Sequence, residues 1–311
     1  MDELNNKWLH VEFSEVGAEM CRIVGLRTKN EYIWNGDPQY WDQHSPLLFP
    51  LVGKLRDGKA LIDGKVYEIP KHGFVSRERF ERISCTASSV TYRLESKPAM
   101  HRIYPFPFRL DVTYKLRANH IAVSWTILNT GLNLMPFHIG GHPGINYPNF
   151  DPQAKVKAYA SFRKPSPIES ASVCNTGCLG PDRYDLPLES GFLPITDECF
   201  SNDAIIIDEN QVENISIFDA NKNPYVSMDF DAPVLLLWSP YGVNAPFVCL
   251  EPWYGLCDAE TYNGEFVNRP YTNLVEPGHQ ITLGYTLYCD AEVTPDALST
   301  RTRKLAQQQP K

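Results

Sequence analysis

The stretch "IAVSWTILNT" (residues 121–130) places a large apolar residue at every second position from 121 to 127. Side chains of a β-strand point alternately to its two sides, so this spacing predicts a strand with one buried face and one polar face. The residues are also β-branched or aromatic to an extent typical of strands. An extended, half-buried strand is therefore expected here.

Similar alternation recurs along the chain, whereas convincing helical periodicity is nearly absent. Strands at this spacing, joined by turns without intervening helices, indicate an all-β fold in which antiparallel sheets form a sandwich. The best helix candidate is the tail at 295–309, where a proline precedes a polar, basic run. The further predicted strands are "VTYRLES" (90–96), "LDVTYKL" (110–116), "ISIFDA" (215–220), "YVSMDFD" (225–231) and "ITLGYTLY" (281–288).

The length of 311 residues fits either two ordinary domains or one large all-β domain. The 25 prolines and 19 glycines are spread along the whole chain and favour many short elements, with no interior linker. We expect a single domain over 1–311, with 292–311 a frayed or helical tail. Residues 150–200 show little periodicity and are predicted to form long loops over one face.

The formal net charge of −8 argues against nucleic acid or an anionic membrane surface as a partner. No apolar run is long enough to span a bilayer, and the N-terminus "MDELNNKWLHVEF" is acidic where a signal peptide would be basic and then apolar. A cytoplasmic protein is expected, with reduced thiols. Cys174 and Cys178 form a C-x3-C pair without a second ligand pair, which disfavours structural zinc.

Two early stretches carry unusual charge for core strands. In "SPLLFPLVGKLRDGK" (45–59) an apolar run meets Lys54 and Arg56, which an edge strand ending in a solvated turn would also explain. In "IPKHGFVSRERF" (69–80), His72 precedes a glycine and is followed by Arg77 and Arg79. A histidine beside glycine is more often a turn residue than a functional one.

The stretch "HIGGHPGINYP" (138–148) sets His138 and His142 four residues apart. They would share a face of an extended strand, but the two intervening glycines make that doubtful. A metal site needs three or four ligands and no third is visible nearby, so no metal is expected. A single histidine presented by a turn is better suited to proton transfer, because its unperturbed pKa lies near neutrality.

In "APFVCLEPWYGLCDAE" (245–260) an apolar strand delivers Glu251 beside Trp253 and Tyr254. A buried carboxylate needs a partner, and a salt bridge to an arginine is the simple explanation. Alternatively, partial burial adjusts the proton affinity of Glu251, and the aromatic rings stack on the apolar face of a sugar.

These four stretches, in this order, resemble the aldose 1-epimerase family, also called galactose mutarotases. The likeness is strongest to its lactose-operon branch and to glucose-6-phosphate 1-epimerases. It extends from about residue 10 to 290 and includes "EYIWNGDPQYW" (31–41), "FSNDAIII" (200–207) and "LLLWSP" (235–240). The resemblance implies an antiparallel β-supersandwich that binds a small-molecule sugar in a cleft, without cofactor or metal. We expect a monomer or homodimer.

The resemblance also implies roles for single residues. His142 corresponds to the general acid, Glu251 to the general base, and His72 to a histidine that holds the ring oxygen. Lys54 stands where the family has an arginine, which keeps the charge but loses the bidentate fork. The sugar-binding aspartate falls on Asp203, with Asp197 in reserve. The predicted substrate-binding set is Lys54, His72, Arg77, Asp203 and Trp253.

The chemistry of anomer exchange fits such a pair. The O1 proton leaves, the ring oxygen gains a proton, the C1–O5 bond opens, and the ring recloses on its other face. Each positioned proton-transfer group contributes on the order of 10² to 10⁴ in rate, so one acid and one base suffice. A hexose 6-phosphate, held by Lys54, Arg56, Arg77 and Arg79, is an alternative substrate. A non-catalytic sugar-binding protein also stays open, as does a glycoside hydrolase or lyase, although hydrolases usually present two carboxylates.

Overall fold

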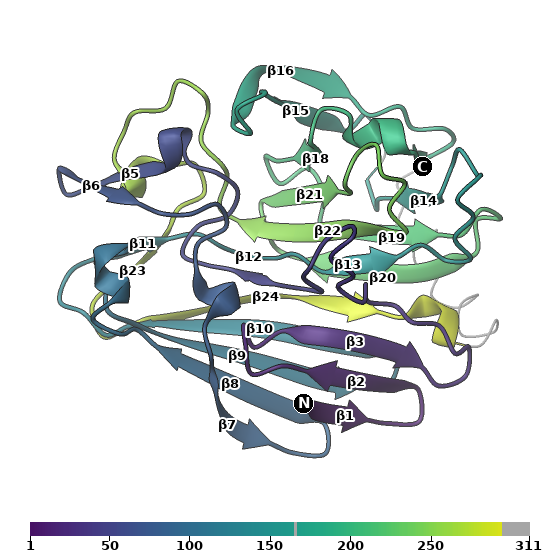
Figure 1. The fold of residues 1–311 in the computed structure, drawn as a ribbon, viewed down its shortest axis with the longest axis horizontal. Coiled ribbons are helices and arrows are strands. Elements are labelled where there is room, and N and C mark those ends of the chain that lie inside the picture. The colour runs from purple at the N-terminus through teal and green to yellow at the C-terminus, as the bar shows by residue number, and fades with distance from the viewer. Residues whose placement is uncertain (165–166, 294–311) are drawn as a thin grey trace.

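The computed structural model describes residues 1–164 and 167–293, and in these ranges its helices are all short 3-10 turns. Two large antiparallel sheets make up most of the molecule (Figure 1). The all-β, antiparallel prediction is confirmed. The short helices are η1 (Arg56–Gly58), η2 (Val75–Arg77), η3 (Met100–Arg102), η4 (Asp197–Phe200), η5 (Phe266–Asn268) and η6 (Asp290–Glu292).

The first large sheet has nine strands and one polar face. On β10, buried and partly exposed residues alternate without interruption, as the sequence pattern predicts. Its outer face carries directly opposed polar pairs, such as Thr126 with Thr282 and Arg93 with Asp111. In spatial order the strands are β17 (Phe192–Ile195), β14 (Ala158–Ser161), β19 (Asn214–Phe218), β20 (Pro224–Phe230), β24 (Gln280–Tyr288), β10 (His120–Asn129), β9 (Phe108–Arg117), β8 (Ser89–Glu95) and β7 (Glu81–Cys85).

The second large sheet has eight strands, and its central strands are apolar on both faces. On β21, Leu235 and Leu237 belong to the main core, whereas Leu236 and its neighbours on the same side form a second apolar cluster. A continuous apolar run is typical of a strand covered on both sides. The strands are β16 (Leu179–Asp185), β15 (Glu169–Val173), β18 (Ala204–Ile207), β21 (Val234–Trp238), β22 (Phe247–Tyr254), β12 (Ile139–Gly141) and β4 (Leu47–Leu48), with β13 (Gly144–Asn146) also paired to β22.

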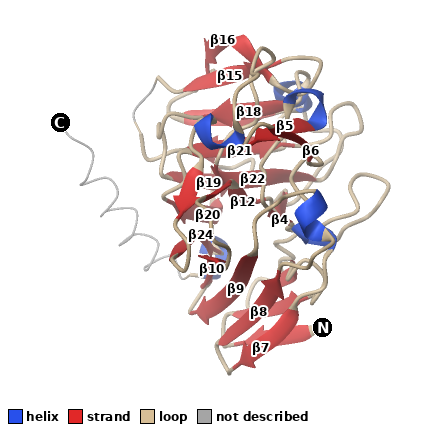
Figure 2. Ribbon diagram, turned by 90° about the vertical axis from the view of Figure 1, so that its left-hand side faces the viewer, coloured by secondary structure: helices blue, strands red, loops and turns tan. Residues whose placement is uncertain are grey.

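The core lies between the two large sheets (Figure 2). Trp125 of β10 meets Tyr254 of β22 edge to face at 6.3 Å, and the Tyr254 hydroxyl donates to the carbonyl of Gly284 on β24. A three-stranded sheet extends the sandwich, since Phe13 packs on Tyr114 of β9 at 4.6 Å. The smaller sheets are β1 (Asp2–Asn5), β2 (Leu9–Phe13) and β3 (Met20–Gly25), then β5 (Lys59–Ile62) with β6 (Lys65–Glu68), and β11 (Met135–Phe137) with β23 (Asn273–Val275).

The prediction of long loops over 150–200 is wrong, because β14 to β17 lie there. These strands are short and lie at or near sheet edges, and most residues of β16 are exposed. β16 has so little apolar burial that it leaves no period-two signal, whereas β14 and β17 alternate but are only four residues long. The predicted tail lies outside the described residues from 294 onward, and the single domain stays a prediction. No helix within the described ranges is long and apolar enough to cross a bilayer.

Candidate active site

A cleft of about 650 Å³ opens on the face of the eight-stranded sheet that points away from the main core. The central strands β18, β21 and β22 contribute its floor, and loops from the first half of the chain contribute its walls. The structure brings the predicted catalytic pair and the predicted substrate-binding set to this one cleft: Lys54, His72, Arg77, His142, Asp203, Glu251 and Trp253. Arg56 and Arg79, the other two predicted phosphate contacts, do not line it.

Glu251 is placed by the alternation of β22. Val248 and Leu250 point into the main core, so Glu251 and Trp253 point to the cleft face. Glu251 is completely buried, with 0% of its surface exposed. Its Oε2 accepts a hydrogen bond from the Trp253 indole Nε1–H at 3.1 Å, which fixes the carboxyl group. No arginine pairs with it among the described residues, so the simple salt-bridge explanation does not hold.

His142 lies in the turn between β12 and β13 and faces Glu251. Its Nε2 lies 3.1 Å from Glu251 Oε1. The imidazole ring packs on Trp41 at 4.8 Å and on Trp238 at 5.8 Å between ring centroids. Its backbone N–H donates to the carbonyl of Pro46, which anchors the turn to the strand that ends at Leu48. Backbone and aromatic contacts therefore hold the ring in the cleft wall.

Gly140 and Gly141 make this placement sterically feasible. A Cβ on Gly140 would lie 2.7 Å from the Trp253 ring, and a Cβ on Gly141 would lie 2.8 Å from the Tyr285 ring. Each glycine thus lets an aromatic ring lie directly on β12, one toward the cleft and one toward the core. The glycine pair that interrupts the histidine stretch is explained by this close approach.

Burial shifts the pKa values of the pair in opposite directions. Desolvation lowers the pKa of His142 to about 3 from its ordinary 6.5, and desolvation raises the pKa of Glu251 well above its ordinary 4.5. A neutral imidazole beside a protonated carboxyl group differs from an ion pair only in the position of one proton. Over a wide pH range these shifts favour one proton on the pair, held by the Glu251 carboxyl group beside a neutral imidazole. The two groups are in contact but form no hydrogen bond as placed, because Glu251 Oε1 has no hydrogen-bond partner among the described residues. A general base must be ionised to accept a proton, and burial disfavours that form of Glu251 in the free protein.

His72 has a defined tautomer. Its backbone lies in the left-handed region at φ 64°, and its Nδ1 accepts the Gly53 N–H at 3.1 Å. Because burial lowers the pKa of His72, the ring is neutral and its single proton is on Nε2. The ring meets His142 edge to face at 5.4 Å. His72 therefore offers a neutral N–H donor beside His142.

Charged side chains surround the opening of the cleft. Lys54 donates to the carbonyl of Thr176 at 2.6 Å, and Arg77 lies 3.5 Å from Asp42. Asp203 is exposed and lines the cleft at a left-handed φ of 77°. Asp197, the reserve choice, does not line it and accepts the Gly242 N–H instead.

The sequence reasoning missed Lys71 and Gln43, which also line the cleft. The charge of Lys71 acts on His72, His142 and Glu251. In the sequence, Lys71 could have been identified from its position directly before His72. Trp41 and Trp238 line the cleft, whereas Trp34 and Trp125 are buried outside it, as expected of core residues.

Two other sequence candidates lie elsewhere. His138 is fully buried against Phe266, and its Nε2 contacts the Thr272 hydroxyl at 3.0 Å. It does not line the cleft, and the two glycines between it and His142 lie in the strand β12. Cys174 and Cys178 belong to no group of three metal ligands within the part of the chain that the structure describes.

The fold makes this chain a galactose mutarotase-like β-sandwich protein. The chain belongs to the aldose 1-epimerase family, whose sequence model matches residues 3–269. The resemblance drawn from the four stretches is confirmed. The chromosomal form of protein LacX from Lactococcus lactis subsp. lactis is 30% identical over 287 residues, which cover 88% of this chain and 94% of LacX.

Two solved structures share the fold over nearly their whole length. A galactose mutarotase related enzyme from Lactobacillus acidophilus has a TM-score of 0.86 at 28% identity, covering 92% of this chain and 96% of that one. A galactose mutarotase-like protein from Lactobacillus casei ATCC 334 has a TM-score of 0.87 at 25% identity, covering 93% and 99%.

Proposed function

We propose that this protein is an aldose 1-epimerase that interconverts the α and β anomers of a hexose. The observation that carries the proposal is the 3.1 Å contact between His142 Nε2 and Glu251 Oε1 at the floor of a cleft lined by tryptophans. Family membership supports it. A pyranose has an apolar face for an aromatic ring and hydroxyls for polar groups, and this cleft offers both.

The reaction needs a proton donor at the ring oxygen and a proton acceptor at O1. These two oxygens are bonded to the same carbon, so an acid and a base that lie side by side can reach both. We assign His142 to the ring oxygen and Glu251 to O1, with His72 donating its Nε2–H toward the ring oxygen. Loss of the O1 proton to one group and protonation of O5 by the other opens the C1–O5 bond. After rotation about C1–C2, both transfers reverse and the ring closes.

Catalysis requires one proton on the pair, to be given to the ring oxygen while the other group takes the O1 proton. Burial favours that number of protons over a wide pH range, because it lowers the pKa of His142 and raises the pKa of Glu251. When hydroxyls of a sugar enter, they provide the hydrogen bonds that a charged imidazole and carboxylate need, so the proton moves to His142. Sugar binding thereby converts the neutral pair into a protonated His142, which is the acid, and an ionised Glu251, which is the base.

Anomer-resolved NMR exchange on a panel of aldoses tests the proposal. We expect exchange of at least one hexose to exceed the uncatalysed rate, and His142→Asn to remove that excess. If exchange with the wild-type protein equals the uncatalysed rate for every sugar while binding persists, the chain is a sugar-binding protein without this activity. Unchanged exchange in His142→Asn would remove His142 from the mechanism.

A hexose 6-phosphate is a second candidate substrate, and the charge at the cleft favours it. Lys54, Lys71 and Arg77 all line the opening, and Lys71 has no ion-pair partner among the described residues. An unpaired ammonium group beside a sugar-sized cleft is suited to a phosphate oxygen.

Comparison of glucose with glucose 6-phosphate separates the two candidates. If the phosphate is bound, Lys71→Ala raises KM for the phosphorylated sugar and leaves KM for the free sugar unchanged. Lys115→Ala, on the nine-stranded sheet, is a matched control for loss of one positive charge. Equal changes for both sugars would assign Lys71 to the hexose ring and remove the support for a phosphate.

A further inference from the structure

A second pocket, of about 940 Å³, adjoins the cleft. The two share Gln43, Ser76 and Arg77 as lining residues. The segment that carries Trp41 to His142 also carries His44, which lines the second pocket. The second pocket is therefore connected to the cleft through two segments, the loop that carries Trp41 and His44 and the short helix η2.

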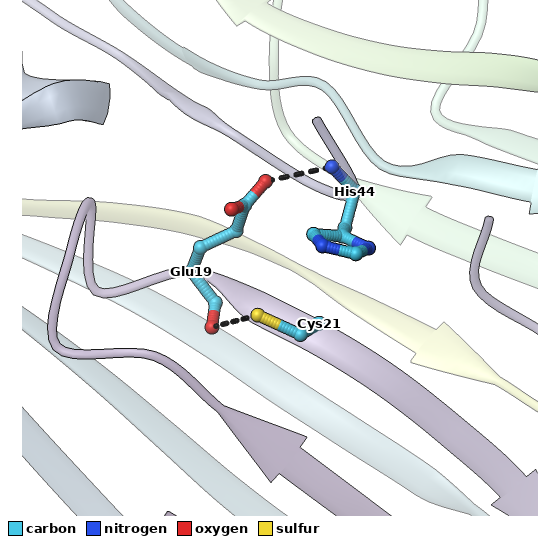
Figure 3. A group of neighbouring side chains, drawn as sticks. All are labelled: Glu19, Cys21 and His44. Carbon is cyan, nitrogen blue, oxygen red and sulfur yellow. Dashed lines mark hydrogen bonds between the residues drawn. The ribbon is translucent and has the colours of Figure 1, made fainter. Parts of the chain in front are cut away.

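Glu19, Cys21 and His44 form a compact group in this pocket (Figure 3). One potential ligand atom from each lies within 4.8 Å of the others, and all three residues are partly buried. Around a tetrahedral Zn²⁺ with bonds of about 2.0–2.3 Å, neighbouring donor atoms are roughly 3.5 Å apart. Small side-chain rotations would therefore close the group around an ion.

Backbone contacts already orient the carboxylate. Glu19 Oε1 accepts the backbone N–H of His44 at 2.8 Å (Figure 3). It also accepts the backbone N–H of Ser45 at 2.8 Å. These two bonds tie Glu19 to the loop that carries His44. They engage one oxygen, and Oε2 has no hydrogen-bond partner among the described residues, so it is available as a ligand.

The imidazole of His44 is set in the tautomer that a metal needs. Its Nδ1 lies 2.9 Å from the carbonyl oxygen of Trp34. A carbonyl can only accept, so Nδ1 carries the proton and Nε2 carries a lone pair. Metal-binding histidines usually have this arrangement, with the second nitrogen donating to a carbonyl.

Gly36 keeps the lone-pair edge of the ring open. A Cβ at this position would lie 2.7 Å from Cε1 and 3.0 Å from Nε2 of His44. Its φ of 75° is in the left-handed region, which also favours glycine. A larger residue would cover the nitrogen that is free to bind.

We propose that Glu19, Cys21 and His44 bind a divalent transition metal of the Zn²⁺ class, outside the reaction cleft. A thiolate, an imidazole and a carboxylate are donors that zinc accepts together, and three protein ligands leave one position for water. The ion would link the start of β3 to the Trp41 loop. It would thus brace the ring that packs on His142, and this proposal does not depend on the proposed activity.

Metal titration of the chelator-treated full chain tests the site. We expect one Co²⁺ per chain, with a thiolate-to-cobalt absorption band that Zn²⁺ abolishes by displacement. Cys21→Ser should lose the band, and His44→Asn should weaken Zn²⁺ binding on the order of 100-fold. Cys85→Ser is the matched control, because this cysteine is exposed on β7 and should leave binding unchanged.

Glu19→Gln separates metal binding from folding. The amide oxygen can still accept both backbone N–H groups, so the metal-free variant should keep the wild-type melting temperature. It should lose most of the rise in melting temperature that Zn²⁺ gives the wild type. Absence of saturable Zn²⁺ binding to the wild type overturns the proposal. Equal binding by the Cys21→Ser/His44→Asn double variant also overturns it, because the ion would then lie elsewhere.

Discussion

The two large sheets differ in what their second faces do. The nine-stranded sheet buries one face and turns the other to solvent, where cross-strand pairs such as Thr126 with Thr282 lie. The eight-stranded sheet buries one face in the same core but carries the cleft, with Glu251, on the other. In this molecule, therefore, strands that are apolar at consecutive positions belong to the sheet whose second face carries the candidate site.

Glu251→Gln is expected to have the largest effect. The amide is nearly isosteric and retains a hydrogen-bond acceptor for Trp253, but it cannot take the O1 proton. Catalysed anomer exchange should fall on the order of 10² to 10⁴, with little change in sugar binding. Polarimetry and sugar titration measure the two quantities. A loss of less than tenfold would contradict the assignment of Glu251 as base.

Leu237→Ala should destabilise the fold rather than the site. Leu237 is fully buried between the sheets, so its truncation should lower the free energy of unfolding by about 2–5 kcal/mol. Leu236, the preceding residue, faces the cleft. Its replacement by alanine should cost less stability, because the vacated space joins the cleft, and should raise KM instead. Urea unfolding and steady-state kinetics of both variants measure the free energy of unfolding and KM. Equal losses of unfolding free energy would contradict the predicted difference between the two positions.

The pH profile tests whether burial keeps one proton on the pair of His142 and Glu251. A second proton binds only in acid, since burial lowers the pKa of His142 to about 3, and the last proton leaves only above the raised pKa of Glu251. Catalysed exchange should stay constant from mildly acid pH up to that raised value, then fall about tenfold per pH unit. An inflection of the exchange rate near pH 6.5, the ordinary pKa of histidine, would contradict the lowered pKa of His142.

Thr126→Ala should have the smallest effect. Within the described part of the chain, its hydroxyl bonds only to Thr282 on the solvent face, at 2.9 Å. The loss in unfolding free energy should be about 0.2–1 kcal/mol, and the exchange rate should not change. Thermal unfolding and polarimetry check both. A change in rate would show that the outer face of the nine-stranded sheet is coupled to the cleft.

The sequence predicted the strands that have one buried and one solvent-facing side, because burial on one side requires apolar residues at every second position. It predicted Glu251 and His142 through the cost of burying a carboxylate and through a histidine in a glycine turn. Edge strands such as β16 were not predicted, because exposed strand residues need no apolar side chain at every second position. Lys71 was not predicted either, because a lysine next to a histidine is common. Only the fold shows that both residues line one cleft.

The hydrogen bond from the Trp253 indole to Glu251 gives the protein a built-in optical reporter. Indole fluorescence responds to charge placed beside the ring. A proton that leaves or reaches Glu251, or a sugar that settles over the ring, should therefore alter the emission of the unlabelled chain. Stopped-flow mixing could then follow occupancy of the cleft in real time.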